Sequence, residues 1–412
     1  MKLVYSFNIN NDNSILELCQ VSKCLYNQAL YEIKENLKTN DKFLFYKDLD
    51  KIMKTKVNLE NQVNYKLLKA QTSQQILKLL EKDILSYIRS IKDYSKNKDK
   101  YKGKPELPKF KKKHNLLVYT NQSSVIRNGY LYLNRELKIS IPQYDKYKDL
   151  LSTFNQVRII PKMNYLKVEI IYEKQIENSD LNYDEYSSID LGIDNLVSLV
   201  TNNQKPLLFS GKQIKSLNQY FNKTLSRLQS IKDKQKIKGL THKIRKLYEN
   251  RENELKDLFH KISRFIVNYL LKNKIGNLVI GYNKGWKDSI TLGKKTNQKF
   301  VQIPYQQLIS YLQYKCDLVG IKIVLTEESY TSKCDSLSLE NIGKQDNYSG
   351  KRIKRGLFQS SVNKLLNADI NGSLNIMRKV VDDSYVNMII NSGLLFNPIK
   401  IRNLFNMNLN FL

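Results

Sequence analysis

The sequence is poor in the residues that usually cross-link or anchor a chain. Its 412 residues include 4 cysteines, Cys19, Cys24, Cys316 and Cys334. They form no Cys-x-x-Cys pair, and no histidine lies at zinc-ligand spacing from them. Buried thiols are therefore expected, and a structural zinc is not. No window approaches the roughly 18 uninterrupted apolar residues of a membrane span, and the first apolar run is too short for a signal peptide. We expect a cytoplasmic protein without a membrane partner.

Acidic residues are scarce relative to basic ones. The chain has 39 Asp and Glu against 69 Lys and Arg, a net charge of +30 that is spread along its whole length, and 27 Tyr and 14 Phe that can stack on bases. A basic surface that serves only solubility is the alternative. An excess of this size favours a polyanion, and specifically nucleic acid, as the partner. The length allows two or three domains, each with a core of its own.

Hydrophobic periodicity changes several times along the first half of the chain. Residues 2–9 alternate as a strand does, and from about residue 14 to 97 apolar residues recur at helical spacing. Alternation returns in "SSVIRNGYLYLN", "ELKISIP" and "NQVRIIPKMNYLKVEIIYEK", with Asn-Gly and Met-Asn turns. These strands predict a small antiparallel β-barrel, completed by residues 2–9, into which a helical module is inserted.

An alternation of strands and helices begins near residue 186. "YSSIDLGIDNLVSLVTNN" predicts a hairpin, residues 212–272 predict two long helices, and "IGNLVIGY" predicts a buried strand. A helix, the strand "IKIVLTEES" and the helix "NADINGSLNIMRKVV" follow. This order indicates an α/β layer architecture.

Two basic runs are candidates for phosphate contacts. In the first, Phe110 is bracketed by Lys109, Lys111, Lys112 and Lys113. The second, "GKRIKRGLF", contains Lys351, Arg352, Lys354 and Arg355. Each run could be only a solvated face, but the interleaved aromatic in the first and the position of the second between two candidate catalytic segments favour nucleic-acid binding.

Two aspartates stand out as candidate catalytic acids. Asp190 lies in an apolar strand, where a carboxylate is costly unless it is paired or bound to a cation. Asp369 opens a helix, so a simple helix cap is its alternative reading. Because two acids from distant segments must converge to hold Mg²⁺ against a phosphodiester, the pair is what a ribonuclease-H-like nuclease needs.

A third acid is expected at the end of the strand in "NLVIGYNKGW", but that strand ends in Gly281. The next strand ends in Glu327 and Glu328, and either could reach the same metal if the two strands are neighbours. Strand alternation places Glu327 on the face of Ile323 and Leu325, yet both faces of a central strand can be covered, so the choice between them stays open. Asp288 is a weaker candidate in a polar loop.

The segments "SSIDLGIDNLVSLVTN", "NLVIGYNKGWK", "EESYTSKCD" and "KRIKRGLFQSS…LLNADINGSLNIMRK" together resemble the TnpB (OrfB) family of small insertion sequences, which is related to type V CRISPR effectors. Upstream, "CLYNQALYEIKE" and "GKPELPKFKKK…LLVYTNQ" look like the helical recognition module and the start of the wedge barrel of that family. The resemblance covers nearly the whole chain.

The resemblance implies an α+β multidomain chain with a wedge-type antiparallel β-barrel, an inserted helical recognition module, and a split ribonuclease-H-like (RuvC) domain with a helical lid. The implied domains are the wedge barrel at 1–13 and 105–178, the helical module at 14–104, the RuvC domain at 179–330 and 366–412 with lid helices at 212–272, and a target-nucleic-acid-binding insertion without zinc at 331–365.

The resemblance also implies an activity, namely that of an RNA-guided DNA endonuclease. Its partners would be a guide RNA derived from the transposon end and double-stranded target DNA next to a short adjacent motif. Asp190 and Asp369 match the acids of the first and third RuvC motifs. Two Mg²⁺ ions, or Mn²⁺ in their place, would be held by these acids with Glu327 or Glu328.

Two positions depart from the family pattern. The usual middle Glu is Gly281, and of the cysteine pairs of a zinc knuckle only Cys334 remains. A nuclease-dead, RNA-guided DNA-binding repressor is therefore the main alternative, although retention of both aspartates argues against it. A DNA-joining transposase with a ribonuclease-H-like fold is a third reading, which the predicted barrel and helical insertion disfavour.

Overall fold

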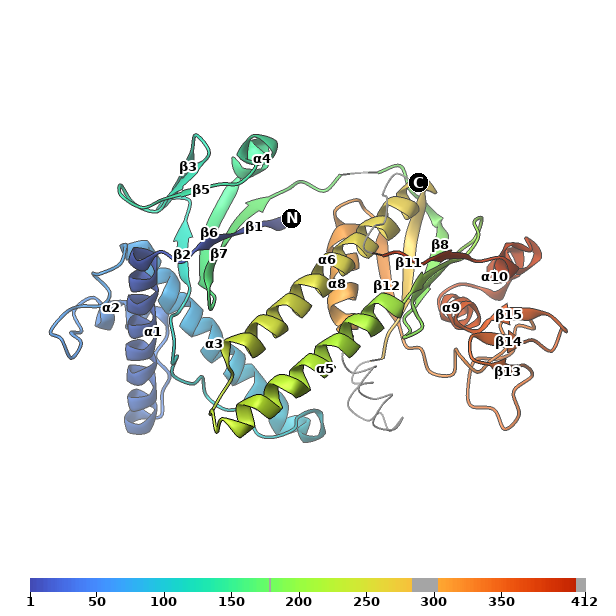
Figure 1. The fold of residues 1–412 in the computed structure, drawn as a ribbon, viewed down its shortest axis with the longest axis horizontal. Coiled ribbons are helices and arrows are strands. Elements are labelled where there is room, and N and C mark those ends of the chain that lie inside the picture. Colours follow the sequence, from blue (N-terminus) through green and yellow to red (C-terminus); the bar gives the residue numbers. More distant parts are fainter. Residues whose placement is uncertain (178, 284–302, 405–412) are drawn as a thin grey trace. The chain divides into compact units, whose positions relative to one another are not determined.

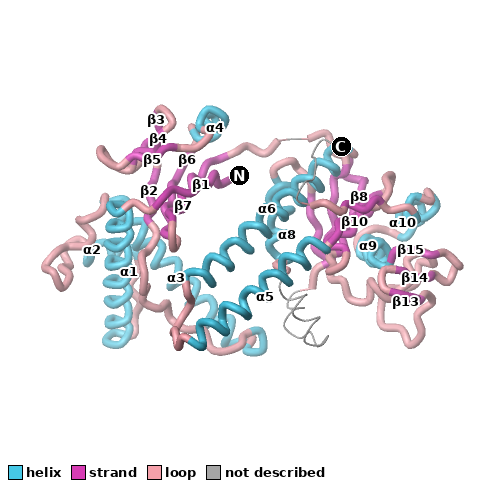
Figure 2. The backbone as a smooth tube through the Cα atoms, in the orientation of Figure 1, coloured by secondary structure: helices cyan, strands magenta, loops and turns pink. Residues whose placement is uncertain are grey.

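Contacts along the chain divide it into two units, Met1–Gln175 and Ile176–Leu412. The computed structural model describes residues 1–177, 179–283 and 303–404. Each unit is described by itself (Figures 1 and 2). Within the described ranges, no helix is both long enough and apolar enough to cross a membrane.

The first unit combines helices with two antiparallel sheets. Its elements are β1 (Lys2–Asn10), α1 (Asn13–Asn40), α2 (Tyr46–Met53), α3 (Ala70–Lys96), η1 (Lys98–Lys100), β2 (Leu117–Thr120), β3 (Val125–Arg127), β4 (Tyr130–Tyr132), β5 (Lys138–Ser140), α4 (Tyr144–Leu151), β6 (Phe154–Pro161) and β7 (Tyr165–Glu173). Four strands pair in the order β1-β7-β6-β2, and β3, β4 and β5 form a separate sheet. The strands expected to form one barrel are thus divided between two sheets, because hydrogen bonding links β2 to β6 and not to β3.

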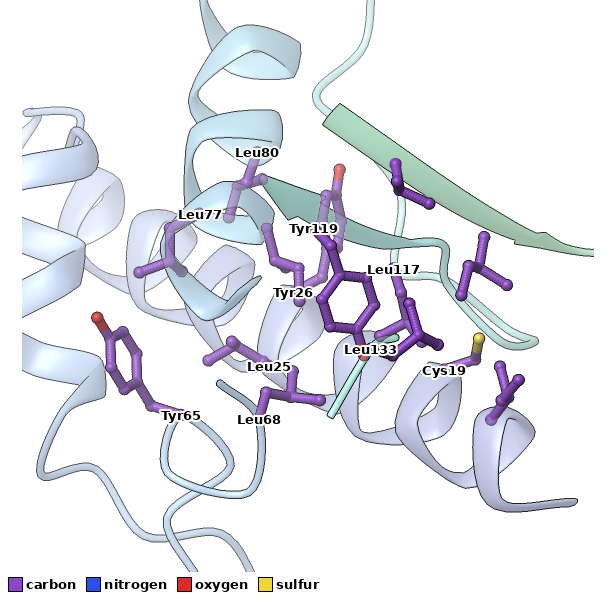
Figure 3. Packing of buried hydrophobic residues seen from close by; sticks show 14 of the residues in the cluster. Cys19, Leu25, Tyr26, Tyr65, Leu68, Leu77, Leu80, Leu117, Tyr119 and Leu133 are labelled. Carbon is purple, nitrogen blue, oxygen red and sulfur yellow. The ribbon is translucent and has the colours of Figure 1, made fainter. Parts of the chain in front are cut away.

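The helices and sheets of the first unit share one hydrophobic core. Figure 3 shows Leu25 and Tyr26 of α1 packed with Leu77 of α3 and with Leu117 and Tyr119 of β2. All five side chains are buried, because the apolar stripe of each helix faces the apolar side of a strand. The helical segment and the strands around it therefore pack as one body.

The second unit is built on a mixed sheet. Its elements are β8 (Asn182–Asp190), β9 (Asn195–Thr201), β10 (Leu207–Ser210), α5 (Lys212–Lys234), α6 (His242–Lys272), β11 (Ile275–Gly281), α8 (Tyr305–Asp317), β12 (Lys322–Thr326), β13 (Lys351–Lys354), β14 (Leu357–Gln359), β15 (Leu365–Asn367), α9 (Ala368–Arg378), α10 (Asp383–Asn391), η2 (Leu394–Phe396) and β16 (Ile399–Ile401).

Six strands of the mixed sheet lie in the order β12-β11-β8-β9-β10-β16. The predicted hairpin is present, since β8 and β9 pair antiparallel with Asp190 opposite Ser198. Strand β11 runs parallel to both β8 and β12, so the carboxyl ends of β8, β11 and β12 meet at one edge. That edge is where an open sheet of this kind places its ligands.

Helix α9 packs across this sheet, and β13, β14 and β15 form a small antiparallel sheet beside it (Figure 1). Ser373 in α9 donates to the carbonyl of Ser188 in β8 at 3.0 Å. Ile370, Leu374 and Met377 are fully buried against the sheet and α10. The predicted helical pair at 212–272 is also present, as α5 and α6, with residues 235–241 between them.

Candidate active site

Asp190 is the last residue of β8, at the edge where the parallel strands end. The strand before it is fully buried at Ile189, so the backbone fixes the direction of the acid. A Cβ atom on Gly372 of α9 would lie 2.7 Å from Asp190 Oδ2. Because only a residue without a side chain leaves that space, Gly372 lets the carboxylate lie against the helix.

Asp369 lies in the first turn of α9, but it is not the helix cap. The cap is Asn367, whose side-chain oxygen accepts from the backbone N–H groups of Asp369 at 3.0 Å and Ile370 at 3.4 Å. The Asp369 carboxylate is therefore available for other contacts. Its Oδ2 accepts from the Asn195 amide at 2.6 Å, and its Oδ1 lies 3.7 Å from Arg352 Nη2.

Glu328 comes to the sheet edge beside Gly281, where the middle acid was missing from the sequence. A Cβ atom on Gly281 would lie 3.2 Å from Glu328 Oε2 and 2.5 Å from Cδ1 of Ile376. Two side chains thus occupy the space that a larger residue at position 281 would need. The Glu328 backbone N–H donates to the Asn283 side chain at 2.9 Å, which holds the turn after β12.

Glu327 points away from this group. Its carboxylate is exposed and lies 3.2 Å from Lys379 Nζ, and the Ser329 hydroxyl also donates to it. The alternation of β12 ends at Thr326, and a turn follows in which the Thr331 N–H donates to the Glu328 carbonyl at 3.2 Å. The turn, and not the strand period, therefore decides which of the two glutamates faces Asp190.

Asp190 lies within electrostatic reach of both Asp369 and Glu328. Burial raises the pKa of Asp190 well above its ordinary value; the charges of Asp369 and Glu328 add to the rise, and Arg352 opposes it. Burial, followed by the charge of Glu327, raises the pKa of Glu328 to about 7, and Lys379 opposes that rise. Acids with raised pKa values at a sheet edge are typical of a functional site.

The donors in this group are all carboxylate oxygens, which are the ligands that Mg²⁺ and Mn²⁺ prefer. Their mutual repulsion is the kind that a bound cation relieves. In the part of the chain that the structure describes, no three His, Cys, Asp or Glu side chains stand in an arrangement that could hold one metal ion. The chemistry of the donor set fits a divalent cation, and a coordinating arrangement would require a shift of these side chains.

A basic cavity opens beside Asp369. It has a volume of about 840 Å³, and it lies between β9, β10, β16 and the loop that follows β13. Its cationic lining residues are Lys212, Arg352, Arg355, Lys400 and Arg402. Strand β16 contributes to the cavity because it pairs parallel with β10, with Ile399 opposite Leu207. An anionic strand that entered the cavity would reach Asp369.

The two predicted basic runs differ in their surroundings. Arg352 and Arg355 line the cavity, and Arg355 forms an ion pair with Asp194. Lys351 and Lys354 belong to β13, whose residues are all exposed. Lys212, Lys400 and Arg402 were not predicted as site residues, because an isolated basic residue forms no recognisable sequence pattern.

The run at residues 109–113 belongs to the first unit and lies along α1. Lys34 Nζ lies 4.4 Å from the centroid of the Phe110 ring, and Lys111 Nζ lies 4.4 Å from that of Tyr26. Lys109 pairs with Glu106 at 2.8 Å. Lys112 and Lys113 are exposed.

Hydrogen bonds organise the segment 331–365, which contains Cys334. Asp335 is fully buried, and its Oδ2 accepts from the Ser360 hydroxyl at 2.7 Å, the Ser361 N–H at 2.8 Å and the Ser361 hydroxyl at 2.9 Å. Glu340 accepts from the N–H groups of Asp335 and Ser349, both at 2.7 Å. The buried carboxylate of Asp335 thus links parts of the segment that lie about 25 residues apart, and half-buried Glu340 links nearer parts.

Helix α9 holds this segment through two asparagines that sequence reasoning missed. The Asn371 and Asn375 amides donate to the Cys334 carbonyl at 2.8 and 2.7 Å, and Asn375 also donates to the Thr331 carbonyl at 2.9 Å. Both side chains are fully buried. The sequence signal that could have revealed them is the spacing of four residues, which places both asparagines on the same face of an otherwise apolar helix. Asp288 and Trp286 lie outside the described residues.

Known proteins resemble the chain in sequence and in fold. Residues 169–287 match the family model OrfB_IS605, described as a probable transposase, and residues 305–376 match the Cas12f1-like TNB domain. A TnpB-like protein, ORF457 of Acidianus two-tailed virus, is 25% identical over 215 residues, which cover 50% of this chain and 44% of that protein. The match therefore spans less than half of the relative's length.

Among solved structures, the chain is similar to the cryo-EM structure of a Cas12f1-sgRNA-target DNA complex. The TM-score is 0.57 at 16% identity, over 88% of this chain and 82% of that one. The fold is therefore of the Cas12f type. Together with this fold, the two family matches and the viral relative support a TnpB-family protein.

Proposed function

We propose that this protein is an RNA-guided DNA endonuclease whose acidic centre consists of Asp190, Glu328 and Asp369. The observation that carries the proposal is the position of Glu328, whose carboxylate lies against Gly281, where the family's middle acid would begin. The acid missing from β11 is thus supplied by the segment after β12. Support for the class of function comes from the fold and from family membership.

In this proposal the three acids hold two divalent cations, Mg²⁺ or Mn²⁺, which would activate a water molecule and stabilise the leaving oxygen of a phosphodiester. Asn195 orients Asp369 through its amide, and Asn367 leaves that carboxylate free by capping α9. Gly372 permits the close approach of Asp190 to the helix. The protein's own contribution is to fix the direction of three acids that repel one another.

The remaining domain assignments also belong to the proposal. The β1-β7-β6-β2 sheet would belong to the wedge domain, helices α1 to α3 to the recognition module, α5 and α6 to a lid, and residues 331–365 to a zinc-free target-binding insertion. The mixed sheet with an antiparallel hairpin and parallel outer strands supports a ribonuclease-H-like (RuvC) domain. The guide RNA would be read by base pairing with target DNA, and the basic residues would bind phosphates.

A nuclease-dead, RNA-guided repressor is the second candidate. It is favoured by one observation, namely that both oxygens of Asp369 face protein donors, Asn195 and Arg352. In such a protein Asp369 would stabilise the fold through these two contacts and would not bind a metal ion. The two candidates bind the same nucleic acids and differ in whether DNA is cut.

The test uses the purified complex of the full chain with its guide RNA, a matched double-stranded DNA and Mg²⁺. The native complex is compared with Asp190→Ala, Glu328→Ala and Glu327→Ala by gel electrophoresis of the DNA. Cleavage that requires Asp190 and Glu328 but not Glu327 is the expected result. Tight guided binding without cleavage by the native complex would reject the nuclease in favour of the repressor.

A further inference from the structure

The small sheet of the first unit, β3-β4-β5, has two unlike faces. One face packs into the core through Leu131 and Ile139, which are buried, with Ile126 beside them. The other face is open to solvent. Its residues, which we call the open face, are Val125, Arg127, Tyr130, Tyr132, Lys138 and Ser140.

The pairing register places aromatic and cationic side chains side by side on the open face. Tyr130 stands opposite Arg127 on one side and Ser140 on the other, and Tyr132 stands between Val125 and Lys138. The two tyrosine rings have centroids 6.4 Å apart. Lys138 Nζ lies 5.2 Å from the centroid of the Tyr130 ring. The aromatic surface is thus continuous along β4 and is bordered by positive charge.

A polar cavity adjoins the open face at its Tyr132 end. Its volume is about 670 Å³, and among its lining residues are Lys69, Gln122, Arg127, Asn134 and Arg135. No carboxylate belongs to this lining. Neither Arg127 nor Arg135 forms an ion pair with a described residue, so both guanidinium groups are available to a ligand.

The loop that forms one wall of the cavity is held in place before any ligand arrives. The N–H groups of Ser123 and Ser124 donate to the Thr120 carbonyl at 2.9 and 3.0 Å, and Lys69 Nζ donates to the Ser123 carbonyl at 2.8 Å. The Gln71 amide donates to the Gln122 side chain at 2.6 Å. A preformed wall lowers the entropy that binding must overcome.

We infer that the open face and its cavity bind unpaired nucleotides of a nucleic-acid strand. Bases stack on aromatic side chains without regard to sequence, and a sheet face with one exposed and one half-buried tyrosine offers such a surface. Guanidinium and ammonium groups contact the phosphates that accompany the bases, and the amides of Gln122 and Asn134 can meet base edges. The site lies in the first unit, and it goes beyond the proposed function because it requires no cleavage.

The two tyrosines distinguish this site from general attraction to a basic protein. Charge alone would bind duplex and single strands alike, whereas stacking requires a base that is free of its partner. Tyr130 is 38% exposed, so its removal should cost little stability. Tyr31 of α1 is 53% exposed in the same unit and has no place on the open face, which makes Tyr31→Ala the matched control.

The experiment measures binding of the full chain to short oligonucleotides that carry one 2-aminopurine, whose fluorescence is quenched when it stacks. The probes are a single-stranded RNA, the corresponding single-stranded DNA and a DNA duplex. Variants are Tyr130→Ala with Tyr132→Ala, the corresponding pair of Phe substitutions, and Tyr31→Ala. Thermal melting followed by circular dichroism verifies that each variant is folded.

The expected result is quenching of a single-stranded probe, with affinity reduced by roughly 5-fold or more in the double-alanine variant and retained by the Phe pair and by Tyr31→Ala. Preference for the RNA probe would identify RNA as the source of the unpaired nucleotides, and preference for the DNA probe would identify a displaced DNA strand. Unchanged quenching and affinity in the folded double-alanine variant would overturn the proposal, as would equal, tyrosine-dependent binding of the duplex.

Discussion

The carboxylate of Glu328 and the backbone of Gly281 lie so close that a Cβ atom on residue 281 would be 3.2 Å from Glu328 Oε2. Gly281 is the last residue of β11, and Glu328 lies in the turn that follows the neighbouring parallel strand β12. The relationship explains a glycine at a position where a family pattern has an acid. An acidic side chain can reach this position either from the end of β11 or from the turn after β12. When it comes from the turn after β12, the residue that ends β11 must be small.

This relationship predicts a sharp difference between the two adjacent glutamates. Glu328→Ala should lower the rate of DNA cleavage by roughly 100-fold or more, because a group that acts on the reacting atoms is removed. Glu327→Ala should leave the rate within about a few-fold, since Glu327 is exposed and contacts Lys379. Single-turnover cleavage at saturating guide RNA measures both. Equal losses in the two variants would contradict the assignment of Glu328.

Gly281→Ala should reduce both stability and cleavage. Its methyl group would press on Cδ1 of Ile376 at 2.5 Å and on the Glu328 carboxylate. Overpacking of this kind costs about 1–3 kcal/mol. Because Ile376→Val removes the Cδ1 atom, the double variant should recover part of the loss, as measured by chemical denaturation and by cleavage. Strict additivity of the two substitutions would argue against this contact as the cause.

The basic cavity predicts a specific change in salt dependence. The double variant Lys400→Ala with Arg402→Ala should bind single-stranded DNA more weakly, and the slope of log K against log salt should fall by about 1.4, because each lost phosphate contact contributes about 0.7. Fluorescence anisotropy over a salt series provides the measurement.

The control for that variant removes the same charge elsewhere. Lys256 and Lys261 of α6 pair with Glu252 at 2.5 Å and with Asp257 at 2.7 Å, at half-buried positions outside the cavity. Lys256→Ala with Lys261→Ala should leave the slope nearly unchanged. If both double variants lower the slope equally, only net charge matters and the cavity is not the binding site.

Asp335→Asn should destabilise the second unit. The buried carboxylate accepts hydrogen bonds from Ser360 and Ser361, and bonds to a charged group contribute about 1.5–3 kcal/mol each. Burial raises the pKa of Asp335, but these bonds outweigh burial and hold the pKa below its ordinary value. The stabilisation from the charge is therefore present above about pH 3.9, the value of an unfolded aspartate, and is lost as the pH falls through the folded pKa.

Chemical denaturation between about pH 3 and pH 7 compares the native chain with Asp335→Asn and with Asp346→Asn, an exposed aspartate of the same segment. The difference between native chain and Asp335→Asn should shrink in acid, and Asp346→Asn should behave as the native chain does. A zinc chelator should leave the unfolding curve in place, since hydrogen bonds hold this segment. A large shift on chelation would show that a metal does so.

Lys315 predicts a pH dependence of the same sign as that of Asp335, but at higher pH. It is buried between α6 and α8, where it donates to the His260 carbonyl and to Ser263, both at 2.7 Å. Burial, followed by the charge of Arg264, lowers the pKa of Lys315 to about 7. From there to about pH 10.4 the unfolded chain binds one more proton, so stability should rise with pH by up to about 1.4 kcal/mol per unit.

The substitution Lys315→Met removes the titrating group and should flatten this rise, whereas the exposed Lys344→Met should not. Denaturant midpoints between about pH 7 and pH 9 provide the comparison. A rise of equal slope in Lys315→Met would assign the dependence to another group.

How far the sequence predicts this site depends on how local each signal is. Asp190 and Asp369 could be singled out as candidates because each stands within a distinct strand or helix pattern. The choice between Glu327 and Glu328 was open because the turn after β12 is fixed by Asn283, a residue about 45 positions earlier. Asp335 was missed for the same reason, since its partners lie near residue 360 and nothing in the intervening sequence indicates the pairing.

The fold shows the same limit. The β8–β9 hairpin and the helical pair were predicted, because period and turn residues indicate them directly. The sequence left open whether β11 and β12 are neighbours, and the structure shows that they pair in parallel. The predicted barrel strands pair as two sheets, since alternation says which residues share a face but not which strand lies beside which.

Strands β10 and β16 pair although almost two hundred residues separate them in the sequence. Asp369 belongs to α9, so it cannot reach the sheet edge before that helix has been synthesised. During synthesis the first unit can fold while the second is still incomplete, because the two units are consecutive in the chain. A ribosome-bound chain that ends before residue 368 would carry the nucleotide-binding surface of the first unit but not the complete acidic centre. Order of synthesis would then ensure that binding precedes any capacity to cut.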